Sequence, residues 1–459
     1  MSVRAVAIAL ISVTEVSVAQ RTPPQPVPTP RALGPVIGRT QRTFGSVAQL
    51  LTVRGAVFVQ DPVSRQLWMF DPALTSGRVV LDSASGLGRE NYYGSQVGTQ
   101  IGLFGTFSAA KADGTMHRFR GDSITYQSRV QSGPTDVSFS PEMLIVGNSG
   151  RVGRITPMPT IAGVPCFMGE VENSGFYMCQ VDLPLTRDPD VDMGDSVMTR
   201  MRGDSATLLS VNFATWEVDS VPVRITVPQR TQLVVRDKAT SRAHSTGEYP
   251  VIAAFDRWAT FRDGTLAIVR GADYHLEIVD VRGAVTKGAR APYDWRRVTD
   301  ADGDRLLDSL AAATRLADSL QRRRIDSLAA RLPRDSTDVL RRLQMRVSAA
   351  TSYAPRDQWS SYWPPITMTV NGPNSSATIM IDEDDRVWVN ERQPPGGDTI
   401  TVFGIFDRKA RFLERVKVAP GELVRGFGAG GVVYLTTVDG GRTTVIARRF
   451  KAFSTPAPQ

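Results

Sequence analysis

The clearest structural signal in this chain is Asp263-Gly-Thr-Leu-Ala-Ile-Val-Arg270, followed by Tyr274-His-Leu-Glu-Ile-Val-Asp280. It has the form of an Asp/Gly turn, an alternating apolar strand, a polar turn, a second strand and an Asp that begins another turn. The same pattern occurs twice more. The copies are Gly55-Ala-Val-Phe-Val-Gln-Asp61 with Gln66-Leu-Trp-Met-Phe-Asp71, and Asp385-Arg-Val-Trp-Val-Asn390 with Thr399-Ile-Thr-Val-Phe-Gly-Ile-Phe-Asp407.

A unit of this kind cannot bury its own apolar faces, so several copies must stack. Radial stacking of small antiparallel sheets gives a β-propeller. We therefore expect an all-β fold, a six-bladed β-propeller with an α-helical insertion, and we keep a seven-bladed propeller as the alternative.

Four blades can be placed from the strand pattern, at 47–81, 101–130, 251–285 and 366–418. The third and fourth blades are harder to divide, and we assign 137–179 to one and 206–227 to the other. Strands at 432–435 and 443–447 would close the fold, because propellers often pair strands from the two chain ends and so remove exposed edges. Trp68, Trp258 and Trp388 occupy comparable positions in separate repeats, the first and third inside strands and Trp258 just ahead of one, so each should pack between sheets.

The N-terminus predicts export. Arg4 precedes a short apolar run at 5–13, which suits a signal-peptide core better than a membrane span. Small residues at 17–19 place cleavage before Gln20, so the mature protein should begin there. A buried N-terminal strand is the alternative. We expect a signal peptide at 1–19, a Pro-rich linker at 20–45, the propeller at 46–450 with a helical insertion at 302–348, and a tail at 451–459. The expected location is periplasmic or secreted, with no lipid anchor.

The two cysteines agree with export. Cys166 and Cys179 flank an Asn-Ser-Gly turn between two apolar arms. If the hairpin centres on Glu172 and Asn173, the sulfurs face each other, and a structural disulfide is the main prediction. Two free buried thiols are the alternative, since the spacing fits neither a redox pair nor a zinc site.

One segment departs from the β pattern. Between 304 and 346 the apolar residues follow three-and-four spacing, which predicts an amphipathic helix with an Arg/Asp outer face. Pro333 should end it, and Asp335-Ser336 could cap a shorter second helix. The helix is either an ordinary insertion packed on one face or a lid or partner-docking element.

Three segments, 255–270, 386–391 and 425–434, together with the helical insertion, resemble exported bacterial six-bladed β-propeller proteins of the NHL/TolB-like kind. The resemblance covers most of the mature chain and is strongest after Tyr249. It implies the fold and export. It implies no particular activity, since that group is mostly of unassigned function.

Groups suited to catalysis are few. The three histidines, His117, His244 and His275, are isolated in sequence, and His117 and His275 sit in strand patterns where imidazoles usually pack. We assign no catalytic and no cofactor-binding residue and expect no cofactor. Metal ligands are unknown: Asp188-Pro-Asp-Val-Asp-Met-Gly-Asp195 and Asp300-Ala-Asp-Gly-Asp304 alternate carboxylates, but neither completes a calcium loop, so each is best interpreted as a solvated turn or helix cap.

The net charge of +8 comes from dispersed arginines rather than a basic run, so no nucleic-acid partner is expected. We also expect no membrane span and a monomer. The function we predict is a scaffold that binds an unknown small ligand or envelope protein through loops at one end of the channel, without covalent chemistry. The alternatives are a propeller hydrolase or lyase that acts on a small ester, lactone or peptide with a divalent cation, and a cell-envelope assembly factor.

Overall fold

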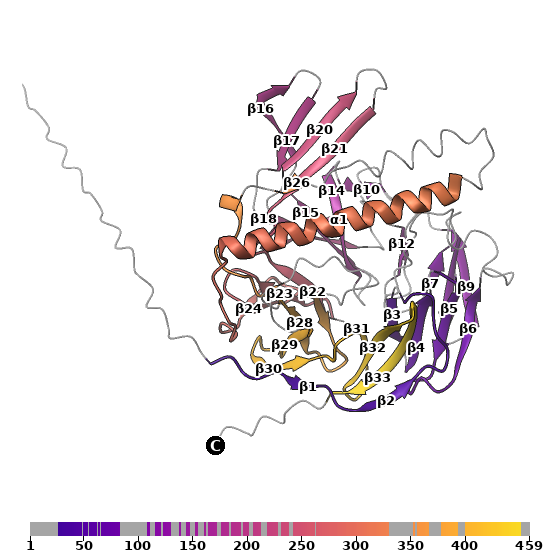
Figure 1. Cartoon of the computed structure of the whole chain (residues 1–459). Coiled ribbons are helices and arrows are strands. Elements are labelled where there is room, and N and C mark those ends of the chain that lie inside the picture. Colours follow the sequence, from indigo (N-terminus) through magenta and orange to yellow (C-terminus); the bar gives the residue numbers. More distant parts are fainter. Residues whose placement is uncertain are drawn as a thin grey trace, which may run out of the picture.

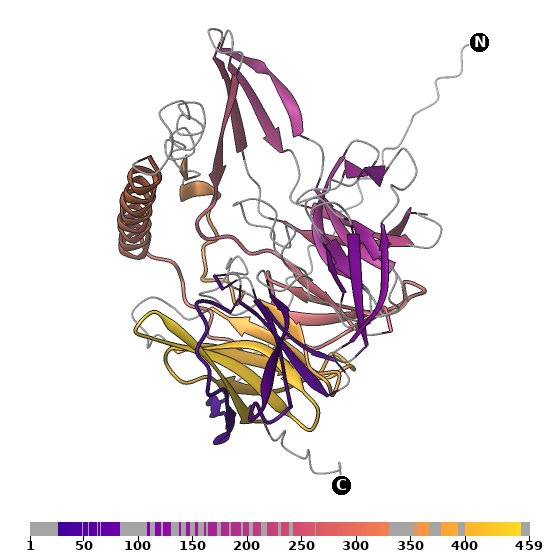
Figure 2. The ribbon, with the colours of Figure 1, turned by 90° about the vertical axis from the view of Figure 1, so that its right-hand side faces the viewer.

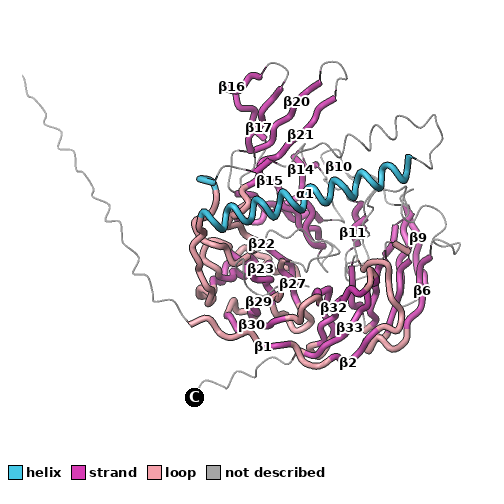
Figure 3. The backbone as a smooth tube through the Cα atoms, viewed as in Figure 1, coloured by secondary structure: helices cyan, strands magenta, loops and turns pink. Residues whose placement is uncertain are grey.

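The computed structural model describes residues 26–47, 49–53, 55–61, 63–64, 66–82, the strands between 108 and 249, 250–261, 263–329, 352–353, 356–366, 378–392 and 400–450. These residues form many small sheets and one long helix, α1 (Asp300–Ala329), beside a single turn of 3-10 helix at Arg356–Gln358 (Figures 1 and 3). The expected all-β fold with a helical insertion is confirmed at this level. No helix of the described residues is both long enough and apolar enough to cross a membrane.

The repeated sequence unit forms four-stranded antiparallel sheets in which strands pair in chain order. They are β3 (Gln49–Val53), β4 (Ala56–Asp61), β5 (Gln66–Phe70) and β6 (Gly77–Asp82); β22 (Arg257–Thr260), β23 (Leu266–Arg270), β24 (His275–Val279) and β25 (Val285–Lys287); and β27 (Ile379–Ile381), β28 (Val387–Glu391), β29 (Val402–Phe406) and β30 (Phe412–Lys417). Trp68, Trp258 and Trp388 lie on the third, first and second strands of these sheets, so their predicted equivalence is wrong.

The two ends of the chain share a sheet. Strands β31 (Glu422–Gly428), β32 (Val432–Asp439) and β33 (Arg442–Arg449) are joined by β2 (Val36–Arg39), which pairs with β33. Strand β1 (Arg31–Ala32) adds in parallel to β30. The expected pairing of strands from the two chain ends is therefore present, and two strands lie within the stretch 20–45 that the sequence suggested was a linker.

The hydrophobic core lies between neighbouring sheets. One cluster joins β18 (Ser205–Asn212) and β19 (Val218–Thr226) to the β22–β25 sheet, and the next joins that sheet to β27–β30. Two more join β27–β30 to β31–β33, and β31–β33 to β3–β6. Strands β28 and β29 are buried along their whole length, because a sheet on each side covers both of their faces.

The predicted division between the third and fourth blades is wrong. Strands β18 and β19 pair with β14 (Val164–Val171) and β15 (Phe176–Asp182), in one sheet with β10 (Val137–Ser138) and β13 (Thr160–Ile161). Two strands that lie between β15 and β18 in the chain pair with three that follow β19, and together they form a separate sheet. They are β16 (Leu185–Met193), β17 (Ser196–Met201), β20 (Thr231–Asp237), β21 (Arg242–Tyr249) and β26 (Ser352–Tyr353).

Two smaller sheets complete the described strands. One contains β7 (Ser108–Ala110), β8 (Thr115–Arg120) and β9 (Ser123–Arg129), in the region predicted as the second blade. The other pairs β11 (Leu144–Val146) with β12 (Val152–Arg154).

The cysteine hairpin has a different register from the expected one. Cys166 in β14 lies opposite Val181, and Cys179 in β15 lies opposite Met168. The two cysteines are therefore displaced by two residues rather than directly opposed. The pairing is also irregular between Met168 and Val171, which shifts the strands relative to an ideal hairpin. The disulfide between Cys166 and Cys179 stays a prediction.

An Asp that directly follows a strand has the same structural role in three turns. Asp280, Asp382 and Asp407 each accept hydrogen bonds from the backbone N–H groups two and four residues later. The residue three positions after the Asp has a positive φ, even where it is Asp385 or Ala410 rather than glycine. The carboxylate therefore stabilises a tight turn in which one residue has a backbone conformation that residues other than glycine rarely adopt.

The turns of the sheets meet at two ends. At one end are the turns 261–265, 280–284, 382–386 and 407–411, where Arg408 pairs with both Asp263 and Asp385 and so ties two sheets together. Since antiparallel strands reverse direction, the connections 271–274 and 288–299, and Arg392 directly after β28, lie at the opposite end. We call this the insertion end, because the chain leaves β25 there to enter α1. Figures 1 and 2 show α1 and the β16–β17–β20–β21–β26 sheet above the sheets of β27–β33.

Helix α1 begins at Asp300, two residues before the predicted start. Thr299 caps it: its hydroxyl accepts the Asp302 N–H at 3.2 Å, and Asp302 accepts the Thr299 N–H at 3.2 Å. Hydrogen bonding from Thr299 and the charge of Arg296 hold the pKa of Asp302 far below its usual value. The acidic cluster at 300–304 is thus a helix cap, as expected. Pro333 and the predicted second helix lie outside the described residues.

We expect α1 to be dispensable for the sheets. None of the described residues of α1 belongs to the four core clusters. The flanking chain segments are held together independently, because Arg297 pairs with Tyr362 and the Val298 N–H donates to Ser361 O at 2.9 Å. Replacing 300–359 by a short glycine linker should leave a β-rich circular dichroism spectrum and a single cooperative melting transition. Loss of the β signal would place the insertion in the core instead.

Candidate binding site

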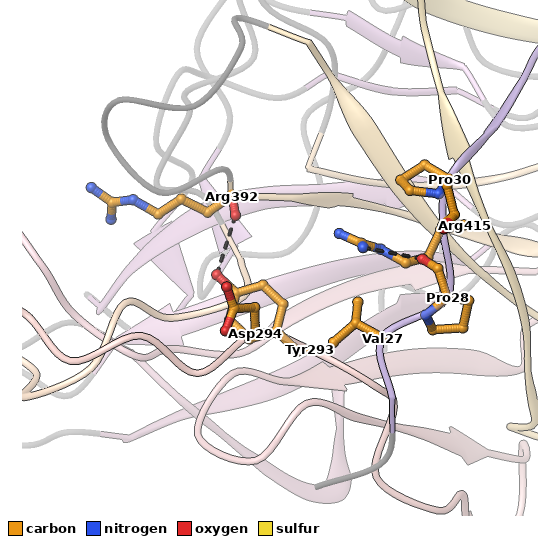
Figure 4. Close-up of a pocket in the computed structure, with 8 residues that line it drawn as sticks. Val27, Pro28, Pro30, Tyr293, Asp294, Arg392 and Arg415 are labelled. Atoms are coloured by element: carbon orange, nitrogen blue, oxygen red, sulfur yellow. Dashed lines mark hydrogen bonds between the residues drawn. The ribbon is translucent and has the colours of Figure 1, made fainter.

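A pocket of about 380 Å³ lies at the insertion end, between the β22–β25 and β27–β30 sheets. Figure 4 shows the N-terminal segment 27–30 along one side, Tyr293 and Asp294 below and Arg392 opposite. Each lining residue lies in a strand or in a segment that adjoins one. Tyr293 and Asp294 follow β25, Arg392 directly follows β28, Arg415 lies in β30, and 27–30 precede β1. The pocket is therefore built from two sheets and the N-terminal segment.

A buried three-residue network stands behind the pocket wall. The Tyr274 hydroxyl donates to Glu391 Oε1 at 2.8 Å, and Arg415 donates to Glu391 Oε2 through Nε at 2.8 Å. The second Arg415 nitrogen lies 2.6 Å from the same oxygen, and Glu391 has no exposed side-chain surface. Burial raises the pKa of Glu391, while Arg415 and the hydrogen bonds oppose the rise. Burial and the Glu391 charge also raise the pKa of Tyr274 well above its usual value.

This network spans both sheets, since Tyr274 belongs to the β23–β24 turn and the other two residues to β28 and β30. Tyr274 has a φ of 50°, a left-handed conformation that its backbone bonds to Arg270 and Ala291 maintain. Arg415 also approaches the N-terminal segment, with a long 3.4 Å hydrogen bond to Pro28 O. The network therefore fixes the Arg415 guanidinium, which points toward the middle of the pocket in Figure 4.

Tyr293 forms the floor of the pocket. Its hydroxyl lies 3.1 Å from the Arg392 carbonyl oxygen and 3.2 Å from that of Pro364, and it donates to these acceptors. Its ring meets Tyr274 and Trp295 edge to face at 5.7 and 5.3 Å. Burial raises its pKa, so the hydroxyl stays protonated at neutral pH. Tyr293 is thus a fixed structural wall.

Arg392 lies at the rim. Its guanidinium stacks over the ring of Trp363, 4.5 Å from the centroid, and extends away from Arg415 in Figure 4. Burial lowers its pKa. Trp363 is fully buried, and no hydrogen-bond partner for its Nε1 lies among the described residues.

Of the two histidines predicted to be packing residues, His275 is buried in the structure. His275 lies in β24, is 4% exposed, and contacts Asp273 at 2.6 Å and Glu277 at 3.0 Å through its two ring nitrogens. Glu277 pairs with Arg270, which also pairs with Asp256. Asp256 accepts the backbone N–H groups of Thr226 and Gly271 and so links β19 to this sheet. The arrangement supports a packing role for His275.

The other candidate residues lie apart from this pocket. His117 is in β8 and His244 is in β21. Of the acidic run 188–195, residues 188–193 lie within strand β16, where only Asp192 and Met193 pair with β17 and the register shifts between Arg187 and Asp192. Among the described residues no group of three or more His, Cys, Asp or Glu side chains could hold a metal ion.

Sequence reasoning did not find Tyr274, Glu391, Arg392 or Arg415. One signal was available in the sequence, a glycine inside the apolar strand 402–406. A Cβ at Gly404 would lie 2.3 Å from the Tyr274 hydroxyl and 2.8 Å from Glu391 Oε1. A glycine in a strand interior often marks such a close approach.

Neither a protein-family model nor a curated protein matches this chain. Among solved structures it is similar to a member of the DUF4221 family from Bacteroides vulgatus, with 9% identity over 93% of this chain and 98% of that chain and a TM-score of 0.33. TolB from Acinetobacter baumannii shares 10% identity over 85% of this chain and 63% of its own, with a TM-score of 0.24. A streptogramin B lyase shares 10% identity over 90% of this chain and 97% of its own, with a TM-score of 0.24. Likenesses this low identify neither the fold nor the function.

Proposed function

We propose that this chain is an exported six-bladed β-propeller that binds a small ligand or partner at the insertion-end pocket, without covalent chemistry. The observation that carries the proposal is a pocket with fixed walls. The buried Tyr274–Glu391–Arg415 network holds one wall, and the Arg392 carbonyl anchors the Tyr293 floor. Fixed walls lower the entropy lost when a ligand binds.

The blade count in this proposal follows the chain order of the sheets. They are β3–β6, β7–β9, β14–β15–β18–β19, β22–β25, β27–β30 and β31–β33 with β2. Strand β3 lies beside β31, which makes the first and last of these sheets neighbours. A closed ring of six blades is the arrangement that this order favours. Export rests on the signal-peptide pattern and on mature processing before Gln20.

The assembly-factor alternative requires an exposed apolar stripe on α1. Leu316 is 61% exposed, but Leu306, Leu307 and Leu310 are half-buried. The side chains that the structure describes in α1 therefore form no continuous exposed stripe, and the pocket supports the binding function better.

A binding assay with a blocked pocket tests the proposal. Wild-type protein and Val27→Trp are compared by thermal shift with acetate, succinate, citrate, succinamide, glucose and glycylglycine. Val27 lines the pocket on the N-terminal segment, so an indole there should fill it. We expect saturable stabilisation of the wild type by at least one probe and its loss in Val27→Trp. Val63→Trp, at a position 67% exposed and outside the pocket lining, is the control. Stabilisation that persists in Val27→Trp, or none with any probe, would reject the pocket as the binding site.

A further inference from the structure

One wall of the pocket is a separate piece of chain. Four of the eight residues that line the pocket are residues 27–30, which lie just ahead of β1. Figure 4 shows this segment along one side of the pocket, with Tyr293 and Asp294 across from it. The remaining lining residues belong to β30, to the residue after β28 and to the connection after β25. Half of the lining would therefore be lost if the segment left its place.

Few backbone contacts attach this segment to the sheets. Strand β1 pairs with β30 at Arg31 and Ala32. Continuing the same register backward would place Pro28 and Pro30 beside the edge of β30, but proline has no N–H to donate to a strand ladder. The hydrogen bond that Arg415 donates to Pro28 O is long, at 3.4 Å. The regular ladder is therefore limited to the two residues of β1.

An ion pair strengthens this short attachment. Arg31 donates to Glu414 Oε2 through Nε at 2.9 Å and to Oε1 through Nη2 at 3.1 Å, so the pair is bidentate. The Arg31 guanidinium also lies 5.2 Å from the centre of the Phe450 ring. The Glu414 side chain is 9% exposed, but that of Arg31 is 31% exposed, so water reaches one side of the pair. Pairs that water reaches contribute modestly to stability.

From Gly34 onward the same chain is held more firmly. The Gly34 N–H donates to Arg449 O at 2.9 Å, and its carbonyl accepts from the Arg448 guanidinium at 3.0 Å. A Cβ at Gly34 would lie 2.6 Å from Arg449 O, so this close contact with β33 depends on glycine. Strand β2 then pairs with β33. Gly34 is therefore the boundary between a lightly attached and a firmly attached part of the chain.

The composition of the segment also favours reversible attachment. Five of the nine residues 22–30 are proline. A proline-rich chain is largely extended before it docks, so it loses little conformational entropy on docking. Few contacts are then enough to hold it in place, and a small change in these contacts can release it.

We infer that residues 26–32 form a strap that releases from the sheets to open the pocket and docks again over a bound ligand. Gly34 is the fixed end of this strap, and the Arg31–Glu414 pair is its fastener. The inference rests on the proposed binding function and adds the way in which the ligand enters. Because the docked strap supplies half of the lining, a ligand that contacts it binds the docked state more tightly than the released state. A bound ligand should therefore hold the strap closed.

Hydrogen–deuterium exchange of the mature protein, measured by mass spectrometry, tests the strap in the absence of ligand. After correction for intrinsic rates, the backbone amides at 31–33 should exchange about tenfold or more faster than those of β2, since the strap opens while β2 stays paired. Glu414→Gln leaves the sequence of the strap unchanged. It should speed exchange at 31–33 about fivefold without affecting β2, because the ion pair is lost.

Two further variants and one probe complete the test. Arg31→Met should act like Glu414→Gln, and the double variant should exchange no faster than either, since both changes remove the same pair. Arg42→Met is the matched control and should leave exchange unchanged, because Arg42 is exposed, stacks over Trp68 at 4.2 Å and does not line the pocket. In the wild type, a saturating concentration of the probe with the largest thermal shift should slow exchange at 31–33 about fivefold or more.

Each contrary result has a distinct meaning. Exchange at 31–33 that is as slow as in β2, or that neither Glu414→Gln nor Arg31→Met speeds, overturns the strap. Faster exchange that extends equally to β2 also overturns it, because the whole chain end is then loosened. If Val27→Trp abolishes the thermal shift but the probe leaves exchange at 31–33 unchanged, the inference fails while the proposed function stands. A thermal shift that persists in Val27→Trp removes the proposed function itself.

Discussion

Replacing Trp388 by alanine should lower the free energy of unfolding by about 3–5 kcal/mol, the usual cost of removing a large buried aromatic side chain. Trp388 in β28 is fully buried between the β27–β30 and β31–β33 sheets. Its ring meets Phe427 and Phe450 at 4.9 Å each, and its Nε1 donates to Asp382 Oδ2 at 2.9 Å. The substitution therefore opens a cavity between two sheets and removes a hydrogen bond from a turn-forming carboxylate.

Chemical denaturation of purified protein, followed by tryptophan fluorescence and circular dichroism, measures this loss. Trp68→Ala is the matched control, because Trp68 is only half-buried and its Nε1 donates to the neighbouring Gln66 side chain. We expect a clearly smaller loss there. Trp388→Phe should retain most of the ring contacts and fall between the two. A loss in Trp388→Ala no larger than in Trp68→Ala would mean that the two sheets do not pack through this residue.

Replacing Arg415 by methionine should lower the free energy of unfolding by about 3–5 kcal/mol, because it leaves a buried carboxylate without its cation. Glu391 has no exposed side-chain surface, and Arg415 is 11% exposed, so water cannot replace the lost partner readily. Glu391→Gln with Arg415→Met together should recover much of this cost, since no buried charge then remains. The double-mutant cycle among these variants measures the coupling directly.

The loss of stability caused by Arg415→Met should increase as the pH increases. Burial already raises the pKa of Glu391, and Arg415 opposes that rise, so removing Arg415 raises the pKa further. A raised carboxyl pKa in the folded state means that stability falls as pH increases through it. The cost of Arg415→Met should therefore be smallest near about pH 4 and grow toward about pH 8. A cost that is independent of pH would show that Glu391 is not the group left uncompensated.

The repeated strand pairs were predictable because each has strict alternation and an Asp-led turn. Strands β23, β24, β28 and β29 lie where the pattern predicted them, and Asp280 and Asp407 form turns that the pattern implied. Helix α1 was also predictable in type and approximate place from its three-and-four spacing, whereas its start at Asp300 and the Thr299–Asp302 cap come from the structure.

Other features depend on long-range pairing that local patterns do not encode. Strand β15 pairs with β18 across an excursion that forms a separate sheet, so the third and fourth blades could not be divided correctly. Residues 31–39 resemble a linker because Pro and Gly surround them, yet β1 and β2 pair with strands near the other end of the chain. The pocket combines residues from positions 27 to 415, and its residues become neighbours only when the sheets pack.

A crystal structure of the mature protein soaked with the probe that gives the largest thermal shift would test the central claim most directly. The predicted result is a ligand in the pocket between the 27–30 segment and Tyr293. Crystals of Val27→Trp soaked in the same way should show no ligand in this pocket. A ligand seated elsewhere on the protein, or no ligand in the pocket of the wild type, would contradict the account.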